Sequence, residues 1–161
     1  MICKLVKGAA RRIYRIVDPH KETRAAYAFY MDTITWSDRS EQGNKYTTVL
    51  RCAASGTYKL LNHYHRNDIV GLVHSWVKKL RLDPAFDKCN YKVLSILFLD
   101  NAGEWDIRSE KWNTMVKEHG IECVYTCPDR CDKKGLSERA CGILEPVVKA
   151  LLMQHNLPPT W

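Results

Sequence analysis

One nearly unbroken apolar segment, residues 93–99, ends directly at an aspartate, Asp100. The segment reads Val-Leu-Ser-Ile-Leu-Phe-Leu, which is typical of a strand that is buried on both faces within a parallel sheet. A carboxylate at such a strand end is costly to bury unless it is paired, hydrogen-bonded or bound to a cation. Asp100 is therefore either a turn residue or a metal ligand, at the edge where open α/β sheets place their chemistry.

The patterns around this segment predict further strands and helices. We expect strands over residues 25–31 (ending at Asp32), 46–52, 57–61 and 121–126, and helices over 69–80 and 109–119. A last helix is expected with Glu138 in its first turn and an apolar stripe over 140–151. Short loops between the first three strands predict antiparallel pairing, whereas helical crossovers predict that the later strands are parallel. The expected fold is α/β, a five-stranded mixed sheet flanked by helices.

Basic residues are concentrated at the start of the chain. Of the net charge of +7, residues 1–24 carry +5, with seven basic and two acidic side chains, which leaves about +2 for residues 25–161. We interpret 1–24 as a basic arm and 25–161 as the folded core. The arm either attracts polyanions such as nucleic acids or is a solvated linker.

The sequence gives few signs of a membrane segment, a signal peptide or a disulfide framework. The longest apolar run is far shorter than the roughly 20 residues that span a bilayer, so no membrane segment is expected. The first residues lack the apolar region of a signal peptide. Seven cysteines, an odd number, favour a reducing compartment over a disulfide framework. We interpret Cys123, Cys127 and Cys131 as unrelated thiols, and His63 and His65 as surface residues.

Three carboxylates are candidates for one cation site. Asp32 and Asp100 each follow a predicted strand, and they would lie side by side if these two strands pair in parallel. Glu138 lies in the first turn of the last predicted helix and points away from its apolar stripe. Taken singly, Asp32 and Asp100 could be turn acids and Glu138 a helix-terminal acid. As an ordered set, they favour a metal site.

Several short segments resemble, in order, those of copia-type retrotransposon integrases. The family's D-N-x-G-E-[FW] segment is similar to residues 100–105, and its first catalytic aspartate and following hairpin are similar to 30–34 and 43–46. The resemblance continues through residues 118–126 and 135–139 and ends in the closing stretch 151–161. It covers about residues 25 to 161 and implies an RNase H-like fold.

The resemblance also implies an activity. It assigns Asp32, Asp100 and Glu138 as the catalytic triad, which would hold two Mg²⁺ (or Mn²⁺) ions about 4 Å apart. The implied reaction is 3′-end processing and strand transfer of retroelement DNA into target DNA by in-line phosphoryl transfer. The candidate contacts to the DNA backbone are basic side chains near the third carboxylate: Lys133, Lys134, Arg139 and Lys149.

Further expectations follow from the same resemblance. The family's zinc module ends in a Cys-x-x-Cys, and Cys3 matches the last of these cysteines. The other three ligands of the module have no match in this sequence, and one thiolate cannot form a four-ligand site, so we expect no zinc in this chain. We expect a homo-oligomer that binds DNA and is nuclear after cytoplasmic particle assembly. The alternative is a catalytically decayed, integrase-derived domain that binds DNA or protein.

Overall fold

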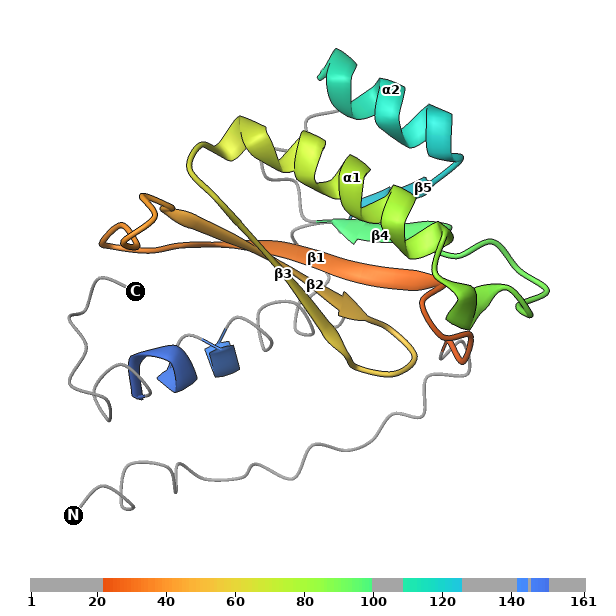
Figure 1. Cartoon of the computed structure of the whole chain (residues 1–161), viewed down its shortest axis with the longest axis horizontal. Coiled ribbons are helices and arrows are strands. Elements are labelled where there is room, and N and C mark those ends of the chain that lie inside the picture. Colours follow the sequence, from red (N-terminus) through yellow and green to blue (C-terminus); the bar gives the residue numbers. More distant parts are fainter. Residues whose placement is uncertain (1–21, 100–108, 126–141, 145, 151–161) are drawn as a thin grey trace.

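A computed structural model describes residues 22–99, 109–125, 142–144 and 146–150 (Figure 1). Three strands come first, after which two α-helices alternate with two further strands. Their bounds are β1 Ala28–Thr35, β2 Tyr46–Cys52, β3 Tyr58–His63, α1 Ile69–Arg81, β4 Ile96–Leu99, α2 Glu110–His119 and β5 Glu122–Tyr125. Two 3₁₀ turns, Arg66–Asp68 and Pro84–Phe86, flank α1, and residues 142–144 and 146–150 are helical. The predicted division at residues 24 and 25 stays a prediction.

The strands form one mixed sheet in the order β3-β2-β1-β4-β5. β1, β2 and β3 pair antiparallel, as their short connections predict, and β4 pairs parallel with both β1 and β5. In the β1–β4 register, Met31 lies beside Leu99. The predicted five-stranded mixed sheet is confirmed, and β1 lies at its centre.

Several predicted strand bounds differ from the structure, those of β1 and β4 the most. β1 begins at Ala28 and continues through Asp32 to Thr35, because antiparallel pairing with β2 extends to the partners Thr35 and Tyr46. β4 begins only at Ile96. The earlier part of the apolar segment is a bend in which Leu94 has a φ of +48°, although its side chain is fully buried. Apolarity predicted burial there correctly but not backbone conformation.

The main core lies between the sheet and the two helices α1 and α2, which cover the same face (Figure 1). From α1, Val73 and Val77 are completely buried, and from α2 so is Trp112. They pack with strand residues that include Phe29 and Met31 of β1. The apolar side chains along one side of each helix therefore pack against the inward-facing side chains of the strands.

The opposite face of the sheet carries a smaller cluster. Ile34, Trp36 and Val49 are buried there, and Leu144 and Val148 from the C-terminal helical residues pack against them. Figure 1 shows these helical residues on the side of the sheet away from α1 and α2. The described part of the last helix thus covers the second face. No helix within the described ranges is long and apolar enough to cross a membrane.

Candidate functional site

Asp32 lies in the interior of the central strand, on the face that the C-terminal helical residues cover. Side chains alternate along a strand, so Asp32 shares a face with Ile34 of the smaller cluster, whereas Met31 points into the main core. Its antiparallel neighbour is Val49, a member of the same cluster. Asp32 is half-buried, and its Oδ1 accepts a hydrogen bond from the backbone N–H of Thr33 at 2.8 Å.

The other two carboxylates of the predicted triad, Asp100 and Glu138, lie outside the described residues. The structure does describe the ends of the segments that lead to them. β4 is described as far as Leu99, beside Met31, the residue before Asp32. Leu144, from the helix that the sequence predicts to carry Glu138, packs on Asp32's face of the sheet.

Three of the four predicted DNA contacts, Lys133, Lys134 and Arg139, also lie outside the described residues. Lys149 is described and is exposed. It follows Val148, which packs against the smaller cluster, so Lys149 belongs to the helical segment on Asp32's face. A DNA contact at Lys149 stays a prediction.

A chain of hydrogen bonds runs across the sheet from the residue next to Asp32. The Thr33 and Thr48 hydroxyls are 2.9 Å apart, and Thr48 Oγ1 is 3.0 Å from His63 Nε2. His63 Nδ1 lies 2.8 Å from the carbonyl oxygen of His65. Because a carbonyl only accepts, His63 donates from Nδ1. The chain therefore connects the residue next to Asp32 to the far end of β3.

The prediction that His63 is a surface residue was wrong. The residue is only 3% exposed, and its ring stacks on Tyr46 with centroids 5.5 Å apart. The strand predicted to end at residue 61 continues to His63, and strand alternation places this side chain inward together with Leu61. Its burial costs little because both ring nitrogens are hydrogen-bonded.

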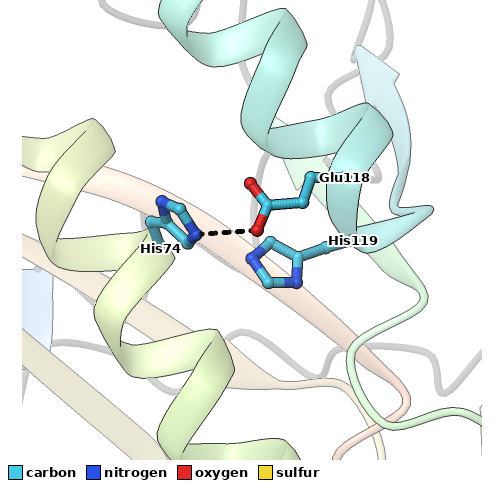
Figure 2. A group of neighbouring side chains, drawn as sticks. All are labelled: His74, Glu118 and His119. Atoms are coloured by element: carbon cyan, nitrogen blue, oxygen red, sulfur yellow. Dashed lines mark ion pairs between the residues drawn. The ribbon is translucent and has the colours of Figure 1, made fainter.

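A second group of polar side chains joins α1 to α2 (Figure 2). His74 comes from α1, and Glu118 and His119 come from the last turn of α2. One ligand atom from each lies within 4.8 Å of the others, and His74 Nε2 is 3.4 Å from Glu118 Oε1. No local sequence pattern marks this group, because its residues come from separate helices.

Arg81, the last residue of α1, sets the protonation of this group. Its guanidinium donates to the carbonyl oxygens of Val93, Leu94 and His119 at 3.1, 3.1 and 2.8 Å. It also lies 3.2 Å from His119 Nδ1. Because a guanidinium can only donate, Nδ1 accepts and the imidazole proton is on Nε2.

Charge and burial shift two of these pKa values. Burial, followed by the charge of Arg81, lowers the pKa of His119 and favours the neutral ring. For Glu118, burial acts to raise the pKa, but the charges of His74 and Lys78 outweigh it, so the pKa is lowered. Lys78 Nζ lies 3.7 Å from Glu118 Oε1. The Glu118 carboxylate thus favours its ionised form beside the two histidine rings.

An open groove of about 1020 Å³ lies beside this group. His74 and Glu118 form part of its wall, together with Asn62 of β3 and Glu110 and Lys111 of α2. Glu118 is exposed and the His74 ring is partly exposed at this wall, although His74 Nε2 itself is buried, and His119 is buried as a whole.

Comparisons with solved structures identify the fold. The chain matches HTLV-2 integrase catalytic core domain, determined in complex with magnesium in a trimeric form, with a TM-score of 0.57 and 15% identity over 83% of this chain and 77% of that one. It also matches the catalytic core domain of BIV integrase, with a TM-score of 0.55 and 18% identity over 84% of this chain and 76% of that one. The fold is that of a retroviral integrase catalytic core. The predicted RNase H-like architecture is thereby confirmed.

A larger assembly gives a further match. A chain of the simian T-cell lymphotropic virus intasome, determined in complex with PP2A regulatory subunit B56 gamma, aligns with a TM-score of 0.63 and 16% identity. The alignment covers 86% of the present chain but only 45% of the intasome chain, so the present chain spans less than half the length of the intasome chain. No family model and no curated protein sequence matches the chain.

Proposed function

We propose that this chain is the catalytic core of a copia-type retroelement integrase, a polynucleotidyl transferase that joins retroelement DNA ends to target DNA. The observation that carries the proposal is the position of Asp32. It lies on the central strand of an integrase-like sheet, one residue beyond Met31, whose parallel neighbour Leu99 directly precedes Asp100 in the sequence. The two carboxylates become neighbours if the β1–β4 register continues by one residue.

The described part of the site fits a hard divalent cation. Asp32 offers carboxylate oxygens, the ligands that Mg²⁺ and Mn²⁺ prefer, and half-burial would limit competition from water. In the proposal, Asp100 and Glu138 complete a two-ion site. Two such ions, when bound, would activate the attacking oxygen and stabilise the leaving oxygen of the phosphodiester.

The protein's own contribution in this proposal is positioning. The Thr33 N–H bond to Asp32 orients the carboxylate, and the strand on which it lies is held by pairing on both sides. Lys133, Lys134, Arg139 and Lys149 would hold the DNA backbone without reading its sequence. We also propose that the chain acts as a homo-oligomer on DNA in the nucleus.

A strand-transfer and disintegration assay on oligonucleotide DNA tests the proposal. We expect activity that needs Mg²⁺ or Mn²⁺ and that falls at least ~100-fold in Asp32→Asn, on the scale of removing one group that stabilises transition-state charge. Asp38→Asn is the matched control, because this exposed acid follows the same strand and loses the same charge.

Two results would contradict the enzyme proposal. Equal activity in Asp32→Asn and wild type would assign the cleavage to a contaminating nuclease. A wild-type protein without activity, and without any rise in melting temperature on adding Mg²⁺ or Mn²⁺, would favour the non-catalytic binding domain instead.

A further inference from the structure

We propose that His74, Glu118 and His119 bind a divalent transition-metal cation of the zinc type, which links α1 to α2. The site lies between the two helices, on the face of the sheet opposite Asp32, and is separate from the proposed magnesium site. The expectation that this chain holds no zinc rested only on the cysteine module and did not concern these residues. Imidazole ligands are found with zinc, copper and nickel, whereas magnesium prefers oxygen ligands.

The first observation is that two buried nitrogens lack partners. His74 Nε2 and His119 Nε2 are both inaccessible to solvent and have no hydrogen-bond partner among the described residues. His119 is only 6% exposed as a whole. Nearly all buried polar atoms in proteins are satisfied by protein, water or an ion, so this pair needs an explanation. Figure 2 shows both rings beside the Glu118 carboxylate.

The second observation is the spacing of the candidate ligands. Tetrahedral zinc binds nitrogen and carboxylate oxygen at about 2.0–2.1 Å, which places neighbouring ligands about 3.3–3.4 Å apart. His74 Nε2 and Glu118 Oε1 are 3.4 Å apart, a distance that is close enough for an ion pair but lacks hydrogen-bond geometry. All three ligand atoms fall within 4.8 Å, so a small rotation of one side chain would complete the set.

Two histidines and one glutamate are a common ligand set for zinc with an open fourth position. Here the open position would face the groove that His74 and Glu118 line, from which water can supply the fourth ligand. Such a site is accessible, so the metal can exchange with solvent.

The positive charges of Arg81 and Lys78 lie close to the proposed site and would repel a cation there, so both side chains must adjust when the metal binds. Since Arg81 donates to His119 Nδ1, the ring proton is on Nε2 in the metal-free protein. Histidine binds a metal as the neutral ring, so binding through Nε2 moves this proton, by way of solvent, to Nδ1. Arg81 then gives up its contact with Nδ1 and keeps its bonds to the carbonyl oxygens of Val93, Leu94 and His119. The Glu118 carboxylate supplies the negative charge at the ion. Lys78, at 3.7 Å from Glu118 Oε1, is mostly exposed and can turn to solvent.

Titration of the whole chain with Co²⁺ and Zn²⁺ tests the proposal. The Co²⁺ complex should show the d–d bands of a tetrahedral ion with nitrogen and oxygen ligands, without the charge-transfer band that cysteine thiolates produce. Zn²⁺ should raise the melting temperature with one equivalent bound. His74→Ala and Glu118→Gln should each weaken Zn²⁺ binding at least ~10-fold. Mutating a residue that only hydrogen-bonds to a metal ligand already lowers metal affinity by about this factor, so losing a ligand should cost no less.

Two variants serve as controls. Glu110→Gln removes the same charge from α2 at the groove wall, and Asp32→Asn alters the proposed magnesium site, so both should bind Zn²⁺ as the wild type does. Zn²⁺ binding that is unchanged in both single variants, His74→Ala and Glu118→Gln, would overturn the proposal. A thiolate charge-transfer band, or no Zn²⁺-dependent stabilisation of the wild type, would also overturn it, and neither result depends on whether a variant folds.

Discussion

At the scale of single residues, Asp32 and His63 show what a local pattern can and cannot predict. The sequence predicted that Asp32 follows a strand and would approach Asp100 if this strand paired in parallel with the apolar segment 93–99, and β1 and β4 do pair in parallel. It did not predict that Asp32 is inside its strand or that His63 is buried. The position of Asp32 inside β1 depends on how far β1 pairs with β2, and the burial of His63 depends on how far β3 pairs with β2. The length of each pairing is set by the neighbouring strand and not by the residues next to Asp32 or His63.

Cys123 gives a prediction at this scale. Burial raises its pKa from 9.0 to about 11. The folded state therefore disfavours the thiolate, and this part of the stability is complete below pH 9 and is lost as the pH rises towards about 11. We expect the free energy of unfolding to fall more steeply over this range in wild type than in Cys123→Ala.

Urea unfolding at a series of pH values measures this difference, since tyrosines and lysines that titrate in the same range are common to both proteins. Parallel curves for wild type and Cys123→Ala would show that the thiol is not protected. Iodoacetamide labelling below pH 9 offers an independent check, because Cys123 should react slowly in the folded protein and quickly in urea.

At the scale of elements, the ends of α2 agree with their sequence signals. Ser109 caps the amino end, with its hydroxyl oxygen 3.4 Å from the backbone N–H of Trp112. Gly120 ends the helix in the left-handed region with a φ of 55°. These signals are local, so they predicted the helix over 109–119 to within one residue.

Two glycine substitutions test this account and should have opposite signs. Gly120→Ala should lower the free energy of unfolding by ~1 kcal/mol, because a side chain disfavours the left-handed conformation. Gly71→Ala should raise it by roughly 0.5–1 kcal/mol, because Gly71 lies within α1 with no atom within 4 Å of an added Cβ. Chemical denaturation of both variants measures the pair. A destabilised Gly71→Ala would contradict the open surroundings of that position.

At the scale of the whole molecule, Arg81 joins three parts of the main core. It extends from the end of α1 to the bend before β4 and to the end of α2 through three backbone carbonyls. Burial lowers its pKa, but a guanidinium stays charged at neutral pH. In the sequence, Arg81 is one of several basic residues at a helix end, and nothing there distinguishes it from Lys79.

Replacing Arg81 tests this long-range role. Arg81→Met should lower the free energy of unfolding by roughly 2–4 kcal/mol, since it leaves partly buried carbonyls without a donor while keeping the apolar stem. Lys79→Met is the control, because this side chain is exposed on the same helix and should change stability by less than ~0.5 kcal/mol. Equal effects in urea unfolding would show that the guanidinium does not hold the segments together.

The sequence by itself determined the succession of strands and helices, the mixed sheet and the candidate carboxylate Asp32. Periodicity, turn residues and helix caps act over a few neighbouring residues, so they can be read along the chain. Only the tertiary structure decided the β1–β4 register, the burial of His63, the carbonyl contacts of Arg81 and the grouping of His74 with Glu118 and His119. Each of these joins segments that are distant in sequence, and such contacts form only when the packing of the sheet and helices brings those segments together.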